Sequence, residues 1–315
     1  MTSKPFISII TPAFNEEKSL SIFYEKLFEV LTSLDVKNEW IVVDDHSNDS
    51  TYQVLKNIAR SDNRVRGVRL TRNYGSHRAI TAGLHLATGD CAIVMATDLQ
   101  DPPEIIPKLI EKWKRDIQIV WAVRSSREGE TNVTKGLSRL YYWLMKRVVG
   151  IENLPSTGAD FFLIDRKVIE ALKLFKESNV SIFSLLTWMG FKQGKISYVK
   201  QARLYGKSGW TIRKKIRLVI DSITSFSHFP IRAMTYLGLS ISMVGFLYAG
   251  FVFYLGMTDN TSPSGWHSLM VVILILGGFQ LIMLGVLGEY LWRNFDESRQ
   301  RPQFLIESDT SIRNK

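Results

Sequence analysis

The segment Asp98-Leu99-Gln100-Asp101 places two carboxylates and one amide directly after an apolar run. The run, 91–97, predicts a buried strand that delivers these side chains to its carboxyl end. Oxygen donors in such a cluster suit a hard divalent cation that bridges phosphates. Pro102 and Pro103 follow at once. A polar turn closed by these two prolines is the alternative interpretation.

Polar residues also follow two other expected strands. The first strand is expected over 6–12, and its end runs into the segment Thr11-Pro12-Ala13-Phe14-Asn15-Glu16. The second is expected over 40–43 and is followed by Asp44-Asp45-His46-Ser47. Either segment alone is also typical of a capped turn. In a parallel sheet, however, the carboxyl ends of neighbouring strands converge. We therefore expect both loops and the Asp98 loop to line one crevice.

Strand and helix patterns alternate along the first part of the chain. Helices are expected at 18–34, 51–59, 78–87 and 103–114, and further strands at 65–70 and 118–123. This alternation predicts an α/β fold, with a mainly parallel sheet and helices on both faces. The pattern then changes, with expected helices at 136–149, 167–175 and 182–188, a loop at 153–157, and strands at 161–164 and 195–201.

Two runs, 233–257 and 266–288, contain no Asp, Glu, Lys or Arg. Each is long enough to cross a hydrocarbon core of about 30 Å as a helix, which predicts a transmembrane hairpin. Two buried core helices are the alternative. Basic residues precede the first run and follow the second, whereas the connector 258–265 has none. The positive-inside rule then places both ends in the cytoplasm, at the inner or plasma membrane.

The apolar positions of 212–229 share one helical face, which is typical of a helix on a membrane surface or of one packed on a domain. Gly245 and Ala249 form a small-xxx-small pair that suits helix packing within one chain or in a homo-oligomer. We divide the chain into a cytoplasmic catalytic domain at 1–202, juxtamembrane amphipathic helices at 203–231, the transmembrane hairpin at 232–292 and a cytoplasmic tail at 293–315.

Composition narrows the classes of partner and compartment. The net charge of +10 fits nucleic acid, acidic lipid or an anionic substrate. Many basic residues lie near the membrane runs and no nucleic-acid-binding signature is evident, so lipid and phosphate are favoured over nucleic acid. Cys91 is the only cysteine, which excludes a disulfide framework within the chain. Met1–Pro5 has no signal-peptide h-region, so we expect the catalytic domain to fold in the cytoplasm.

In order and spacing, a series of segments resembles the family 2 glycosyltransferases of GT-A fold. Within that family the chain is most similar to the polyprenyl-phosphate glycosyltransferases, a group that includes dolichol-phosphate mannose synthase. The resemblance covers nearly the whole chain. Its matching parts are 11–16, 43–45, Ser47, Asp49, Asn73, Gly75, 82–83, 89–90, 98–104, Gly158, Asp160, Arg203, Gly206, Ser208, 225–227, Pro230 and Arg232.

The resemblance implies a nucleotide-diphosphate sugar bound across the first strands. The residues implied in donor binding are Pro12, Ala13, Asn15, Glu16, Asp44, Asp45, Ser47 and Asn73. Asp98 and Gln100 would hold Mg²⁺ or Mn²⁺ against the diphosphate, and Asp160 matches the proposed catalytic aspartate of the family. One position departs from the pattern, because Ala96 stands where these transferases commonly carry an acidic residue.

A lipid phosphate needs basic partners. Arg124 and Arg127 could clamp it by bidentate hydrogen bonds, and Arg203, Lys207 and Ser208 could act from the far side; a solvated basic loop is the alternative. His77 could approach the donor. The predicted reaction is inverting transfer of a sugar, with UDP-glucose favoured as donor, to a polyprenyl phosphate at the cytoplasmic membrane face. The alternatives are a processive polysaccharide synthase and a membrane-anchored protein that binds sugar nucleotides without turnover.

Overall fold

A computed structural model describes residues 4–124, 160–177, 180–199, 201, 227, 229–258 and 265–311. The predicted helix at 136–149, the predicted loop at 153–157 and nearly all of the predicted amphipathic helix at 212–229 lie outside these residues.

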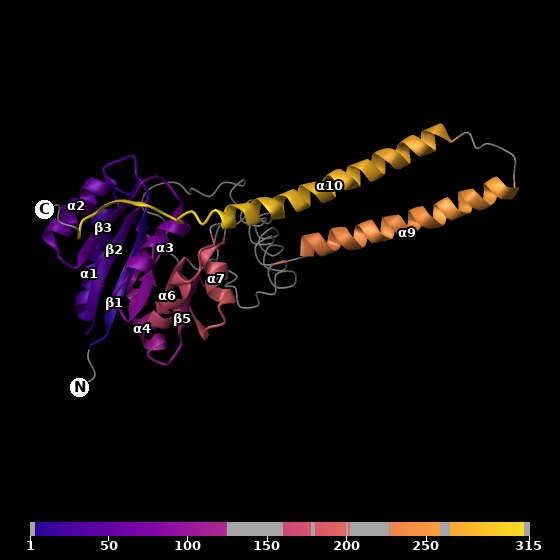
Figure 1. Ribbon diagram of the computed structural model, residues 1–315. Coiled ribbons are helices and arrows are strands. Elements are labelled where there is room, and N and C mark those ends of the chain that lie inside the picture. Colours follow the sequence, from indigo (N-terminus) through magenta and orange to yellow (C-terminus); the bar gives the residue numbers. More distant parts are fainter. Residues whose placement is uncertain are drawn as a thin grey trace.

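The fold is built on an eight-stranded sheet with strand order β7-β5-β6-β4-β1-β2-β3-β8 (Figure 1). The strands are β1 Phe6–Ala13, β2 Lys37–Asp44, β3 Val65–Leu70, β4 Cys91–Val94, β5 Ile119–Arg124, β6 Phe161–Asp165, β7 Gln193–Tyr198 and β8 Ile306–Asp309. β4, β1, β2 and β3 run parallel, as does the pair β5 and β7. β6 and β8 run antiparallel to their neighbours.

Helices cover both faces of this sheet, as predicted. They are α1 Leu20–Ser33, α2 Thr51–Ser61, α3 Ser76–Leu86, the 3₁₀ turn Pro103–Ile105 with α4 Ile106–Trp113, α6 Arg166–Lys173 and α7 Ile182–Trp188. Buried residues of α1, α2 and α4 share one apolar cluster with β1, and those of α3, α6 and α7 form a second cluster. Successive β1 side chains point to opposite faces of the sheet, since Ile9 belongs to the first cluster and Ile10 to the second.

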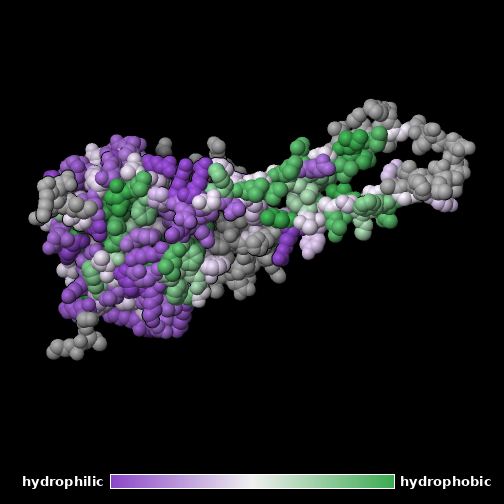
Figure 2. Space-filling model, in the orientation of Figure 1, coloured by the Kyte–Doolittle hydropathy of each residue, from purple (hydrophilic) through white to green (hydrophobic). Residues whose placement is uncertain are grey.

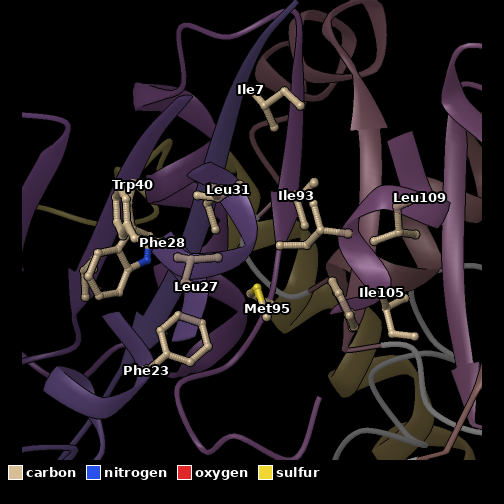
Figure 3. Packing of buried hydrophobic residues seen from close by; sticks show 14 of the residues in the cluster. Ile7, Phe23, Leu27, Phe28, Leu31, Trp40, Ile93, Met95, Ile105 and Leu109 are labelled. Carbon is tan, nitrogen blue, oxygen red and sulfur yellow. The ribbon is translucent and has the colours of Figure 1, made fainter. Parts of the chain in front are cut away.

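The first cluster packs α1 against the sheet. Phe23, Leu27 and Leu31 of α1 lie together with Trp40 of β2 in this cluster (Figure 3). On the opposite face α3 approaches β1 closely at Gly83, where a Cβ would lie 2.3 Å from the Ile10 side chain. A larger residue at this position would push α3 off the sheet.

The central strand β4 is shorter than the sequence predicts. It ends at Val94 instead of Thr97, although Met95 is still buried in the core and its N–H donates to the Ile10 carbonyl at 3.1 Å. Beyond that bond the neighbouring strand carries Pro12, which has no N–H to continue the ladder. The acidic segment therefore begins on an irregular loop and not on the strand itself.

Two long helices follow the sheet domain. α9 spans Phe229–Thr258 and α10 spans Trp266–Ser298, and together they extend from the domain as a hairpin (Figure 1). Both are long and apolar enough to cross a membrane. Hydrophobic residues gather along them while hydrophilic residues dominate the visible face of the domain (Figure 2). Phe246, for example, is 79% exposed, an arrangement that suits lipid better than water.

The chain returns to the sheet after α10. Strand β8 adds to the edge at β3, and Gln303 on the way there donates its Nε2 to the carbonyls of Phe175 and Glu177 at 3.2 and 3.0 Å. The predicted tail at 293–315 did not include this strand. Ile306–Asp309 holds a single apolar residue, so its sequence carries no strand pattern.

Candidate functional site

The predicted site residues that the structure describes lie at one edge of the sheet, formed by the carboxyl ends of its parallel strands. Parallel strands β1, β2 and β4 all end there, and Ala13 pairs with Asp44 in register. β6 runs antiparallel to β4 and β5, so it begins at this same edge, with Phe161 beside Ala122. Asp160, immediately before β6, therefore lies at the edge that also carries the Asp98 loop. This convergence was predicted for the parallel strands alone.

The loops after β1 and β2 are joined by side-chain hydrogen bonds. The N–H of Asn15 donates to Ser47 Oγ at 2.9 Å, and the N–H of Asn48 donates to Asn15 Oδ1 at 2.9 Å. The N–H of Glu16 donates to Thr51 Oγ1 at 2.7 Å, which ties the β1 loop to the start of α2. Asn15 and Ser47, both predicted in donor binding, thus belong to one hydrogen-bonded pair of loops.

Asp45 supports the next loop along the edge. Its Oδ1 accepts the N–H of Tyr74 at 2.7 Å and its Oδ2 accepts the N–H of Gly75 at 2.8 Å. Gly75 has φ +92°, a conformation that glycine adopts without strain and that leads directly into α3. Asp45 is 3% exposed, and burial raises the pKa of its carboxyl while the two backbone donors lower it. Its main role in this structure is to hold the loop beside the site.

Asp44 is fully buried and keeps an acceptor available. Its Oδ1 accepts the N–H of Ser47 at 3.1 Å, whereas its Oδ2 has no hydrogen-bond donor among the described residues. Arg69 Nη1 lies 3.3 Å from Oδ2 as an ion-pair partner. Burial raises the pKa of the Asp44 carboxyl, and the hydrogen bonds from Ser47 and the Arg69 charge lower it. A buried carboxylate oxygen of this kind suits an N–H or O–H group of a ligand.

Each of the three strand-end loops contains one residue in the left-handed region. These residues are Asn15 with φ 57°, His46 with φ 60° and Leu99 with φ 55°. Asn and His adopt this conformation more readily than other residues with a Cβ, whereas Leu99 is strained by it, and strained residues concentrate at functional sites. The coincidence at all three loops supports the assignment of this edge as the site.

Hydrogen bonds of backbone and side-chain groups hold the Asp98 loop in place. The N–H of Gln100 donates to Asp98 Oδ1 at 3.2 Å, and the N–H of Gln201 donates to the Gln100 carbonyl at 2.9 Å. Asp101 is 1% exposed and accepts a hydrogen bond from the Tyr198 hydroxyl. Burial and the Asp101 charge raise the pKa of that hydroxyl, which therefore stays protonated as a donor. Asp101 anchors the loop, while Asp98 and Gln100 are half-buried.

The donor set of the loop bears on the predicted cation. No three His, Cys, Asp or Glu side chains gather into a metal-binding group within the described ranges. Ala96 supplies no ligand, which leaves Asp98 and the Gln100 amide. One carboxylate and one amide fit a Mg²⁺ or Mn²⁺ ion that takes its remaining ligands from water and from a bound diphosphate.

Arg124 and Asp160 form an ion pair where β5 ends and β6 begins. Arg124 Nη2 donates to Asp160 Oδ2 at 3.2 Å, and the two side chains are 22% and 52% exposed. Arg124 Nε is buried and lacks a hydrogen-bond acceptor in the described part of the structure. β5 and β7 pair Arg124 with Tyr198 in register, so the arginine stands next to the residue that anchors the Asp98 loop.

His77, at the start of α3, is a buried polar group of the same region. Its ring packs edge-on against Phe183 of α7 with centroids 4.9 Å apart, and its Nδ1 is buried with no partner among the described residues. Burial lowers the pKa of His77, and the charge of Asp160 raises it in part. The imidazole is therefore neutral near pH 7. The predicted approach of His77 to the donor stays a prediction.

The remaining predicted residues divide into two groups. Pro12 is half-buried, Ala13 is buried and Asn73 is exposed at the same edge. Arg127, Arg203, Lys207 and Ser208 lie outside the described residues. Sequence reasoning did not single out Arg69, Tyr198 or Glu307, each of which contacts a site residue or its immediate partner.

Comparison with known sequences identifies the family to which this chain belongs. Residues 8–173 match the model of glycosyl transferase family 2. The uncharacterized glycosyltransferase YkcC of Bacillus subtilis is 39% identical over 98% of this chain and 95% of its own length. The bactoprenol glucosyl transferase of Shigella phage SfX is 38% identical over 96% of this chain and 99% of its own length.

Solved structures agree on the fold. Glucosyl-3-phosphoglycerate synthase from Mycobacterium tuberculosis, solved with Mn²⁺, UDP and phosphoglyceric acid, superposes with a TM-score of 0.51 at 17% identity over 70% of this chain and 76% of its own. Mannosyl-3-phosphoglycerate synthase from Rubrobacter xylanophilus gives 0.50 at 16% identity over 74% of this chain and 75% of its own. The predicted GT-A fold is confirmed. The chain belongs to glycosyl transferase family 2.

Proposed function

We propose that this glycosyltransferase moves one hexose, with inversion, from a nucleotide-diphosphate sugar to a polyprenyl phosphate at the cytoplasmic membrane face. UDP-glucose is the favoured donor. The observation that carries the proposal is the Arg124–Asp160 pair at the sheet edge that also holds Asp44 and Asp98, in a chain with two apolar helices. Full-length relatives named bactoprenol glucosyl transferase support a prenyl phosphate as acceptor.

The donor nucleotide is assigned to the loops after β1 and β2. Asp44 Oδ2, buried without a hydrogen-bond donor, suits an N–H of the base. Asn15 and Ser47 form the adjoining wall, and Asp45 keeps the Tyr74–Gly75 turn in place. Carboxylate and amide acceptors at this point favour a base with a ring N–H, a group that uracil and guanine both carry.

The diphosphate is assigned to the Asp98 loop. Asp98 and Gln100 would hold the divalent cation, which neutralises negative charge on the leaving diphosphate when bound. Mn²⁺ accompanies UDP in a structure of the same fold. The buried hydrogen bond from the Tyr198 hydroxyl to Asp101 holds this loop in place.

The acceptor phosphate is assigned to Arg124. A phosphate monoester carries between one and two negative charges at pH 7, so it requires positioning more than deprotonation. One of its oxygens attacks the anomeric carbon as the bond to the donor diphosphate breaks, and the nucleoside diphosphate leaves with the electron pair. Asp160, beside Arg124, is placed to accept a remaining phosphate proton or to hold a hydroxyl of the sugar.

α9 and α10 would hold this site close to the membrane that contains the acceptor lipid. As a membrane hairpin they keep the catalytic domain at the headgroup plane, where the phosphate of a polyprenyl lipid resides. The absence of basic residues from the connector and their presence at both outer ends support cytoplasmic termini.

A product assay tests this proposal. The full-length protein in detergent would be incubated with undecaprenyl phosphate, Mg²⁺ or Mn²⁺, and radiolabelled UDP-glucose, UDP-galactose or GDP-mannose in turn. We expect one donor to yield a lipid-extractable product with a single sugar. Polymer would support a processive synthase instead, and nucleotide binding without product from any donor would support a protein without turnover.

A further inference from the structure

Strand β8 brings a carboxylate from the far end of the chain to the candidate donor site. It pairs antiparallel with β3, with Arg69 opposite Ser308. Glu307 Oε2 accepts the Nε–H of Arg69 at 3.0 Å, although the two residues are 238 positions apart in the sequence. Because β8 follows α10, the residues after the second candidate membrane helix reach the loops where the nucleotide is proposed to bind (Figure 1).

Arg69 links Glu307 to the site. Its Nη2 donates to the Ser47 carbonyl at 3.2 Å, its Nη1 lies 3.3 Å from Asp44 Oδ2, and its guanidinium lies 5.3 Å from the centre of the Tyr52 ring. The side chain is 21% exposed. A planar guanidinium with fixed donor directions can face three acceptors at once, so a change at one of them alters its position at the others.

We propose that Glu307 is a positioning residue for the donor nucleotide that acts through Arg69 on Asp44. This inference rests on the proposed function. By holding Nε, Glu307 keeps Nη1 close to Asp44 as a counter-charge without a hydrogen bond to Oδ2, and that oxygen stays available to the donor. Without the Glu307 charge, Arg69 can turn toward Asp44 and occupy the same oxygen.

A neighbouring ion pair on the same two strands provides a matched control. Arg66 Nη2 lies 2.6 Å from Asp309 Oδ2, and the Asp309 side chain is 4% exposed against 47% for Glu307. In the described part of the chain Asp309 makes no hydrogen bond or ion pair with a predicted donor-binding residue. The Arg66–Asp309 pair thus anchors β8, and Glu307 differs from Asp309 in its link to Asp44.

The test compares Glu307→Gln with Asp309→Asn in the full-length protein in detergent. For Glu307→Gln we expect the donor KM to rise about tenfold, with kcat and the KM for undecaprenyl phosphate within about twofold of wild type. For Asp309→Asn we expect a lower melting temperature and an unchanged donor KM. An equal rise of the donor KM in both variants would show that β8 docking alone matters and would overturn the inference, as would no rise in either.

A second variant and a binding measurement keep the test decisive. If Glu307→Gln does not fold, Arg69→Lys is the second variant, because lysine keeps the charge but lacks the planar set of guanidinium donors. Its donor KM should rise similarly, and a wild-type donor KM would overturn the inference. If the wild type binds UDP but transfers no sugar, the proposed function fails alone, and the Kd for UDP in the same variants still decides the role of Glu307. Failure of the wild type to bind UDP, GDP or dTDP would overturn both.

Discussion

Arg124 Nη2 and Asp160 Oδ2 lie 3.2 Å apart, although 36 residues separate them in the sequence. The pair joins a side chain that suits an anionic phosphate to one that suits a proton or a sugar hydroxyl. It lies where the antiparallel strand β6 begins beside the end of β5. The proposed acceptor-binding and catalytic residues are therefore direct neighbours at this edge of the sheet.

Asp160→Asn should separate catalysis from binding. We expect kcat to fall by at least about a hundredfold, because the amide cannot accept a proton, and the Kd for UDP to stay within about twofold. Asp116→Asn is the control, since Asp116 lies in a turn after α4 and its side chain is 92% exposed. Measurement of both constants by transfer assay and calorimetry decides the matter, and wild-type turnover in Asp160→Asn would rule out the general-base role.

Ala96→Asp should strengthen cation binding. The substitution adds a carboxylate two positions before Asp98, where this chain has no ligand, and extra ligand charge raises the affinity for hard cations. We expect the Mn²⁺ concentration for half-maximal activity to fall about tenfold. Ala96→Asn adds a similar volume without the charge and should give a smaller change. An unchanged Mn²⁺ dependence in Ala96→Asp would show that the cation is not held at this loop.

His77 should make the domain less stable in acid. Burial holds its folded pKa below the ordinary value of 6.5, so the unfolded chain binds more protons between these two values. The free energy of unfolding therefore falls as the pH drops below 6.5. In His77→Gln and His77→Phe we expect the melting temperature to fall less between pH 7 and pH 5 than in the wild type. Parallel curves for the wild type and both variants would contradict this placement.

Tyr198→Phe should weaken the support of the Asp98 loop. The variant removes the only hydroxyl of the side chain, which donates to the buried Asp101, and a hydrogen bond to a charged group contributes about 2 kcal/mol. We expect that loss in the free energy of unfolding, together with a higher Mn²⁺ requirement. When Tyr198→Phe is made in the Asp101→Asn variant, the free energy of unfolding should fall by less than in the wild type, which a double-mutant cycle measures. Additive losses would mean that the two residues are not coupled.

The part of the site that depends on short segments could be predicted from sequence. An apolar run followed by Asp98 indicates a strand end, and the same logic applies to Asp44 and Asp45 after β2. The loop lengths and the end of β4 at Val94 depended on the pairing of β4 with β1, which a single segment does not encode. Strand direction was not evident either, and it is the antiparallel β6 that brings Asp160 to the site.

Contacts between distant segments could not be predicted from local patterns. Tyr198 meets Asp101 across 97 residues, and Glu307 meets Arg69 across 238. Nothing in the four residues of β8 favours a strand until the free edge of β3 is present. The sequence thus predicted the strand ends and their polar residues better than the distant contacts that hold those residues in place.

The chemical identity and anomeric configuration of the product test the central claim most directly. The lipid extract from a reaction of the full-length protein with its best sugar nucleotide and undecaprenyl phosphate would be analysed by proton NMR and mass spectrometry. We expect one hexose linked to the lipid phosphate, with the anomeric configuration opposite to that of the donor. Retained configuration, a sugar polymer, or free sugar without a lipid product would contradict direct attack by the lipid phosphate.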